Sequence, residues 1–253
     1  MGKPIMIQVE NLTKKYGDYL AVDQISFTVF ESEIFGLLGP NGAGKTTTLE
    51  IIETLRTKTS GNVVIDGYSL DTDPDEIKKI IGVQLQAAGY SPNLSLTQII
   101  ELFSGLYNVD VDAHQLLDKV ALRDKARARF KDLSGGQKQR FSIATTLIHQ
   151  PKIVFLDEPT TGLDPQARRN LWDLIFEIRN SGTTVVLTTH YMDEAEILCD
   201  RVAFINQGKI ISIDTPNNFI DGLVSKGFQR PKPIKAASLE DVFIHLTGKE
   251  WKE

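Results

Sequence analysis

The sequence predicts an α/β fold in which a mostly parallel sheet is interrupted by a block of helices. Short apolar runs typical of strands alternate with helical patterns before about residue 86 and again after residue 151. Between these stretches, over about residues 87–150, the pattern is helical. A helical subdomain inserted into an α/β core is the simplest account. With 253 residues, 41% of them hydrophobic, the chain can bury such a core.

The first third of the chain is expected to contain strands, turns and one helix. Residues 24–30 place Ile25, Phe27 and Val29 on one face, which is the alternation of a half-buried strand. Residues 34–38 form an apolar run typical of a buried strand and lead through a glycine-rich turn into a helix. The expected strands cover residues 5–9, 24–30, 34–38, 62–65 and 80–85, and the helix covers residues 45–55.

Two helix starts in the inserted block carry the same capping pattern. Ser95 is followed three positions later by Gln98, and Ser134 is followed in the same way by Gln137. Both pairs match the S-x-x-Q capping box. After residue 151 strands and helices alternate again. We expect strands over residues 153–156, 183–188 and 201–205, and helices over residues 165–179 and 192–199.

The carboxyl-terminal region is expected to be separate from the main domain. Residues 228–235 contain Pro231, Pro233 and three basic residues, which is typical of a linker. Residues 238–247 have apolar side chains at helical spacing and predict a short helix that docks back on the domain. We therefore divide the chain into a domain of residues 1–227 and a linker with a short helix over residues 228–253.

Charge and cysteine content argue against several classes of protein. Lys and Arg number 28 against 33 Asp and Glu, and a net charge of −5 argues against a general nucleic-acid binder. The single cysteine, Cys199, cannot form an internal disulfide, so a reducing compartment fits. The longest charge-free run, residues 80–100, is too polar for a membrane span, and the amino terminus lacks the apolar core of a signal peptide. We expect a soluble, intracellular protein.

A phosphate-binding motif follows the apolar run of residues 34–38. Residues 39–46, GPNGAGKT, satisfy G-x-x-x-x-G-K-[ST] and open a predicted helix, which is the context that this motif requires. Backbone N–H groups of such a loop surround an anion, and the helix amino terminus adds positive potential. Lys45 supplies a charge for the β- and γ-phosphates, and the Thr46 hydroxyl is placed to ligate Mg²⁺. A turn that merely caps a helix would not need the Lys-Thr pair, so the sequence predicts a nucleoside triphosphate site.

Two carboxylates end a second apolar strand. Asp157 and Glu158 follow residues 153–156, at the carboxyl end of a strand, where open α/β sheets bind ligands. Asp157 suits a Mg²⁺ contact through water, and Glu158 suits a general base that polarises the attacking water. Paired acids in this position can also cap a helix. The phosphate-binding motif elsewhere in the chain favours the catalytic interpretation.

A third motif carries a family resemblance. Residues 133–140, LSGGQKQR, resemble the signature sequence of ATP-binding-cassette (ABC) ATPases and stand, from Ser134, 23 residues before Asp157, as that family places them. The resemblance covers residues 5 to about 215. It implies a P-loop NTPase with a RecA-like core, an amino-terminal antiparallel β subdomain and the inserted helical subdomain, with ATP and Mg²⁺ as cofactors. The ATP-binding positions that it implies are Tyr16, Val22, Gly39, Pro40, Asn41, Gly42, Ala43, Gly44, Lys45, Thr46 and Thr47.

The same resemblance assigns further residues. Ser134, Gly135, Gly136 and Gln137 correspond to the signature that closes on the γ-phosphate of ATP held by a second cassette, and Asp164 to the loop that crosses this dimer interface. Asp164 is also placed to cap the helix that begins at Pro165. His190 matches the switch histidine. Gln86 matches the glutamine that bridges Mg²⁺ and the transport machinery, although Gln84 lies on the same face of the strand and stays an alternative.

Features outside the motifs narrow the type of cassette. Residues 123–140 hold seven basic side chains, but without an aromatic ladder they indicate a solvated helical face and no nucleic-acid partner. Residues 188–202 and 238–248 resemble cassettes of ABC-2 type exporters. This resemblance implies a homodimer or heterodimer of cassettes, docked through residues 87–93 on a separate integral-membrane permease, at the cytoplasmic face of the membrane. An ATP-gated clamp outside transport is the alternative.

Overall fold

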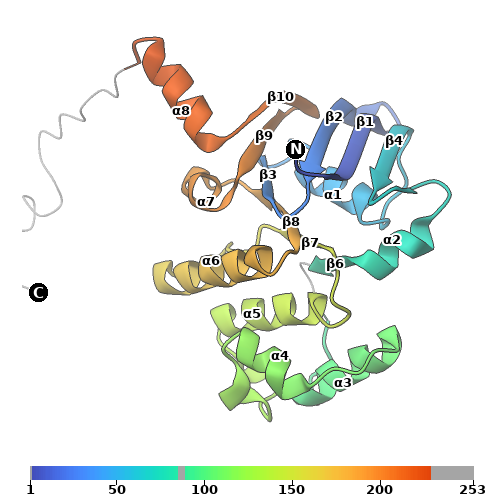
Figure 1. Cartoon of the computed structure of the whole chain (residues 1–253), viewed down its shortest axis with the longest axis vertical. Coiled ribbons are helices and arrows are strands. Elements are labelled where there is room, and N and C mark those ends of the chain that lie inside the picture. Colours follow the sequence, from blue (N-terminus) through green and yellow to red (C-terminus); the bar gives the residue numbers. More distant parts are fainter. Residues whose placement is uncertain (1, 85–88, 229–253) are drawn as a thin grey trace, which may run out of the picture. The chain divides into compact units, whose positions relative to one another are not determined.

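The computed structural model of the chain describes residues 2–84 and 89–228 (Figure 1). The chain divides into two compact units, residues 1–217 and 218–253. Gln86 and the predicted helix over residues 238–247 lie outside the described residues, as does the predicted linker from residue 229 on. The domain boundary after residue 227 therefore stays a prediction.

The amino-terminal part of the first unit is an antiparallel sheet with strand order β2-β1-β4-β5. Its strands are β1 (Ile5–Tyr16), β2 (Tyr19–Phe30), β4 (Ser60–Ile65) and β5 (Tyr68–Ser69). Shifts in the β1–β2 register, one of them between Val9 and Leu12, interrupt the alternation of buried and exposed residues. For this reason the sequence pattern predicted only the first five residues of a strand that has 12.

A six-stranded sheet forms the core, with strand order β10-β9-β3-β8-β7-β6. All neighbouring strands are parallel except β9 and β10, which confirms the predicted α/β class. The strands are β3 (Ile34–Leu38), β6 (Ile81–Gln84), β7 (Ile153–Asp157), β8 (Thr184–Thr189), β9 (Arg201–Asn206) and β10 (Lys209–Asp214). Every residue of β3 and β8 is buried, as expected for central strands of a covered sheet.

Helices follow most of the core strands, and three of them lie between β6 and β7. The helices of the first unit are α1 (Lys45–Ile52), α2 (Pro74–Ile80), α3 (Leu96–Tyr107), α4 (Ala113–Lys119), α5 (Gly135–Thr146), α6 (Pro165–Asn180) and α7 (Met192–Leu198); α8 (Pro216–Ser225) follows β10. Helices α3, α4 and α5 contact one another and form the inserted helical block (green, Figure 1). Both predicted capping boxes are present, at Ser95 and Ser134.

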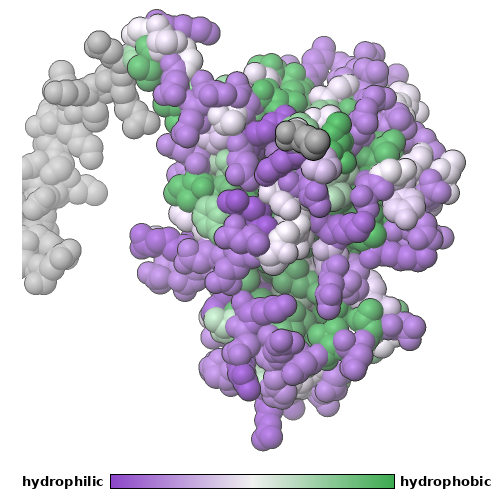
Figure 2. All heavy atoms as spheres, viewed as in Figure 1, coloured by the Kyte–Doolittle hydropathy of each residue, from purple (hydrophilic) through white to green (hydrophobic). Residues whose placement is uncertain are grey.

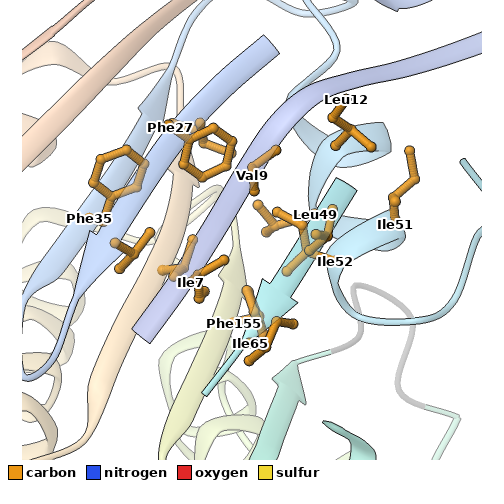
Figure 3. Close-up of a cluster of buried hydrophobic side chains, with 14 of the residues drawn as sticks. Ile7, Val9, Leu12, Phe27, Phe35, Leu49, Ile51, Ile52, Ile65 and Phe155 are labelled. Atoms are coloured by element: carbon orange, nitrogen blue, oxygen red, sulfur yellow. The ribbon is translucent and has the colours of Figure 1, made fainter. Parts of the chain in front are cut away.

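The core joins the two sheets through α1 (Figure 3). Side chains from β1, β2 and β4 meet side chains from α1, β3 and β7 in one buried cluster. Phe27 and Phe35 stack across the sheets with ring centroids 5.4 Å apart. Leu49, Ile51 and Ile52 of α1 are at most 1% exposed. This packing fixes α1, which begins at the phosphate-binding motif. No helix among the described residues has the length and apolarity that a membrane crossing requires.

Candidate nucleotide-binding site

The phosphate-binding loop, residues 39–46, connects buried β3 to α1 and is therefore anchored at both ends. Gly44 caps α1 with a left-handed backbone, φ 103°, and a Cβ there would stand 2.6 Å from the carbonyl oxygen of Ala21. A Cβ on Gly39 would collide with the carbonyl of Ile205. Only glycine fits at these two positions, so the loop keeps its backbone amides accessible to an anion.

Lys45 is the buried cation of the loop. Its side chain is 4% exposed, and its ammonium donates hydrogen bonds to the carbonyls of Gly39 (2.9 Å) and Pro40 (3.1 Å). The Glu158 carboxylate lies 3.6 Å from the same nitrogen. These partners satisfy a charge that would otherwise be costly to bury. The ammonium thus stands between the loop and Glu158, where phosphate oxygens can replace its partners.

An open cleft of about 200 Å³ lies over the loop. Its walls come from the loop, the β1–β2 hairpin and the end of β7: Tyr16, Tyr19, Ala21, Asn41, Gly42, Gly44, Lys45, Thr46, Thr47 and Glu158. Val22, which the resemblance assigned to the base, is fully buried in the core. The β1–β2 register has a bulge at this point, because Lys15 pairs with Leu20 and Lys14 pairs with Val22; Ala21 lines the cleft and Val22 does not.

Tyr16 is one of two aromatic side chains, with Tyr19, that line the cleft and could stack on a base. It is 39% exposed at the end of β1 and pairs across the hairpin with Tyr19. The Lys14 ammonium lies 5.0 Å from its ring centroid, and the Arg56 guanidinium lies 5.5 Å from it. Arg56 is itself held by Glu50 at 2.6 Å. Both cations lie over the ring, and this cation–π attraction helps to fix its orientation.

Asp157 faces the loop from the end of β7. The Thr46 hydroxyl donates to its carboxylate at 3.2 Å, and the Thr188 hydroxyl of neighbouring β8 also donates to it. The described residues contain no group of three His, Cys, Asp or Glu side chains that could hold a metal by itself. One hydroxyl and one carboxylate suit Mg²⁺, which keeps several waters and shares phosphate oxygens. Thr46 and Asp157 therefore fit this ion.

Glu158 has an unusual backbone that aims its side chain at the cleft. Its φ is 47°, a left-handed value that is rare for a residue other than glycine. Its N–H donates to both the hydroxyl (3.0 Å) and the carbonyl (3.2 Å) of Thr188, and these contacts hold this conformation. The carboxylate lies 3.2 Å from Nδ1 of His190 and accepts a hydrogen bond from Thr161 at 3.3 Å. Such local strain is typical of a functional position.

The signature residues, 134–137, lie outside the nucleotide cleft. Ser134 caps α5 by accepting from the N–H of Gln137, whose side chain in turn accepts from the N–H of Ser134. Gly135 and Gly136 form the first turn of α5, and none of residues 134–137 lines the cleft. Asp164 caps α6 by accepting from the N–H groups of Gln166 and Ala167. The structure therefore brings together Tyr16, the loop, Asp157, Glu158 and His190, but not the signature.

Of the two glutamine candidates, only Gln84 can be placed. It ends β6, is 6% exposed, and its buried side-chain oxygen has no hydrogen-bond partner among the described residues. Gln86 lies outside the described residues. The assignment of the bridging glutamine to Gln86 thus stays a prediction.

Comparison with known proteins decides the family. The family model described as "ABC transporter" matches residues 22–161, more than half of the chain. The chain belongs to this family. It is the ATPase subunit of an ABC transporter, an enzyme that binds and hydrolyses ATP, as the motifs and the resemblance predicted.

Related cassettes cover nearly the whole chain. The linearmycin resistance ATP-binding protein LnrL of Bacillus subtilis is 37% identical over 86% of this chain and 72% of its own length. The Nod factor export ATP-binding protein I of Cupriavidus metallidurans is 32% identical over 98% and 99%. The probable multidrug ABC transporter ATP-binding protein YbhF of Escherichia coli is 38% identical over 95% of this chain, which spans 41% of that protein.

Solved cassettes have the same fold. The ATP-binding subunit of an ABC transporter matches with a TM-score of 0.76 and 26% identity over 96% of this chain and 99% of its own. A dimeric cassette bound to ADP and phosphate matches with a TM-score of 0.74 and 30% identity over 83% and 99%. These likenesses agree with the two sheets and the helical block described above.

Sequence reasoning missed three residues that the structure brings to the site. Tyr19 and Ala21 line the cleft, and Thr188 hydrogen-bonds both Asp157 and Glu158. Thr188 carried a usable signal, because it is a polar residue inside a predicted buried strand. Its partner is set by the β7–β8 register, which pairs Asp157 with Thr188. Sequence spacing alone does not give that register.

Proposed function

We propose that two copies of this cassette, or one copy and a paralogue, close head to tail around two ATP molecules. One observation carries this proposal: exposed Ser134 and Gly135 stand at the amino terminus of α5, yet none of residues 134–137 lines the cleft of their own chain. A helix amino terminus attracts phosphate. A second chain that supplies this terminus completes the site, and Asp164 lies in the loop that we assign to the interface.

Each side chain of the cleft has a role in this scheme. Tyr16 stacks on the adenine, the loop of residues 39–47 surrounds the phosphates, and Lys45 moves from its carbonyl partners to the β- and γ-phosphates. Glu158 accepts the proton of the attacking water, and His190, 3.2 Å from that carboxylate, orients it. Thr46 and Gln86, with Asp157 through water, would hold Mg²⁺, which would supply positive charge next to the phosphates.

ATP-driven dimerisation of a Glu158→Gln protein tests the composite site. Without the base, bound ATP persists, and we expect a dimer in size-exclusion chromatography that disappears when ADP replaces ATP. Adding Ser134→Arg places a bulky cation at the α5 terminus and should abolish the dimer while each monomer still binds ATP. Ser95→Arg, at the equivalent capping box of α3, is the matched control and should leave the dimer intact. A Ser134→Arg dimer equal to that of the control would refute the proposal.

We further propose that the cassette powers an ABC-2 type exporter. Its relatives are named for resistance, export and multidrug transport, and this favours transport over an assembly clamp. In this role the chain works at the cytoplasmic face of the membrane, on a separate permease. Co-expression with a candidate permease, chosen as a membrane protein whose gene adjoins that of the cassette, followed by purification in detergent, tests this role. A permease that does not co-purify with the wild-type cassette would contradict it.

A further inference from the structure

His190 meets Glu158 while its ring packs against a neighbouring tyrosine. It follows β8 directly, and α7 begins two residues later at Met192. The His190 side chain is 30% exposed, and its Nδ1 lies 3.2 Å from the Glu158 carboxylate. The imidazole also contacts the ring of Tyr191, with centroids 4.1 Å apart and planes inclined by 39°. The direction in which His190 meets Glu158 therefore depends on where the Tyr191 ring is held.

Arg168 of α6 holds the Tyr191 ring. Its guanidinium lies 4.7 Å from the centroid of that ring, which is a cation–π contact. One terminal nitrogen of the same group lies 3.4 Å from the Asp193 carboxylate. The Arg168 side chain is 22% exposed, and its buried Nε has no hydrogen-bond partner among the described residues. The guanidinium thus gives up the hydration of one N–H to lie on the tyrosine ring.

The backbone around Tyr191 is held by other contacts. The Tyr191 N–H donates to the Thr189 hydroxyl at 3.0 Å. In α7, the Glu194 side chain is fully buried and accepts a hydrogen bond from Nε1 of Trp172 in α6 at 3.3 Å. Its second carboxylate oxygen is buried without a hydrogen-bond partner in the part of the chain that the structure describes, so Glu194 depends on the bond from Trp172. Loss of Arg168 would therefore free the Tyr191 ring while α7 stays attached to α6.

We propose that Arg168 is a positioning residue for ATP hydrolysis, which acts through Tyr191 on His190. Held by the guanidinium, the tyrosine ring keeps the imidazole in the orientation that aligns Glu158 with the attacking water. Such alignment matters because a small displacement of a reacting group from its productive geometry slows the reaction strongly. Neither Arg168 nor Tyr191 lines the nucleotide cleft, so ATP binding does not depend on them. The inference rests on the role proposed above for His190.

Steady-state ATP hydrolysis by an Arg168 variant tests the proposal. Arg168→Gln removes the cation and leaves a shorter, neutral side chain, and we expect kcat to fall roughly 10-fold while KM for ATP stays within about twofold of wild type. The matched control is Arg169→Gln, because Arg169 is the next residue of α6 and is exposed. The surface of α6 seen in Figure 2 is mostly hydrophilic, so this control should keep the wild-type kcat. A wild-type kcat for Arg168→Gln would overturn the proposal.

Combining the change with His190→Ala separates positioning from a general structural role. If Arg168 acts through His190, adding Arg168→Gln to His190→Ala should slow single-turnover hydrolysis by less than about twofold, because the group that it positions is already gone. A further loss of roughly 10-fold in that background would show that Arg168 acts by another route, and the inference would be wrong while the role of His190 stands. If His190→Ala alone hydrolyses ATP at the wild-type rate, the role proposed for His190 is wrong and this inference falls with it.

Discussion

Glu53 follows the last turn of α1 and is 5% exposed, and this burial raises its pKa. Replacing Glu53 by Gln should therefore stabilise the cassette, and the gain in stability should depend on pH. The folded chain keeps the Glu53 proton up to a pKa of about 8, whereas the ordinary value is 4.5. Between these values unfolding releases a proton, so the free energy of unfolding falls as the pH rises. At 1.36 kcal/mol per pKa unit, the raised pKa of Glu53 lowers the free energy of unfolding by about 3 kcal/mol at pH 7. The same decrease is about 1 kcal/mol at pH 5 and between about 4 and 5 kcal/mol at pH 9.

Denaturant unfolding of the nucleotide-free protein, followed by circular dichroism at these three pH values, measures the effect. Glu53→Gln should gain free energy of unfolding at every pH, with the gain increasing from pH 5 to pH 9. Glu101→Gln, on an exposed helix face, should change it by less than about 0.5 kcal/mol. A gain at pH 7 below about 1 kcal/mol, or one that is equal at pH 5 and pH 9, would show that Glu53 is hydrated or paired in the free chain.

Substitutions at four further positions address the nucleotide site. Glu158→Gln should keep ATP binding and lose about 10²–10⁴-fold in hydrolysis, measured as phosphate release; a rate near that of wild type would exclude Glu158 as the base. Lys45→Ala should weaken ATP binding by roughly 10- to 100-fold in a fluorescence titration, and an unchanged affinity would contradict its phosphate contact. Tyr16→Ala should weaken ATP binding by roughly 3- to 10-fold while Tyr16→Phe does not, whereas equal losses would mean that the ring does not stack. Thr188→Val should slow hydrolysis by roughly 10-fold with little change in ATP affinity, because it removes one hydrogen bond from Asp157 and one from Glu158. A rate of hydrolysis equal to that of wild type would show that Thr188 contributes only to packing.

The sequence was most informative where local chemistry decides local structure. The apolar run of β3, the glycines of the loop and the two capping boxes each predicted an element that the structure contains. Strand β10 was missed, because Ile211 is 67% exposed and its edge position has no clear apolar alternation. Helix α1 ends at Ile52, earlier than predicted, and Thr54 then takes a left-handed φ of 65°.

Contacts between distant segments could not be predicted in the same way. Val22 and Ala21 are neighbours in the chain, and only the bulged register of the hairpin decides which of them faces the cleft. Glu53 belongs to no sequence motif, and its burial depends on how α1 packs between the two sheets and the helical block. Residues such as these become functional candidates only in the folded chain.

Each end of helix α1 lies at a hollow. Lys45 begins the helix at the nucleotide cleft, and Glu53 follows its last turn at the wall of another hollow of about 580 Å³, which Phe103 and Tyr107 of α3 also line. Its eight residues make a rod roughly 12 Å long, and its middle is clamped in the core. A tilt of α1 at the Lys45 end would therefore also displace its Glu53 end, because a helix of this length moves as one rigid body.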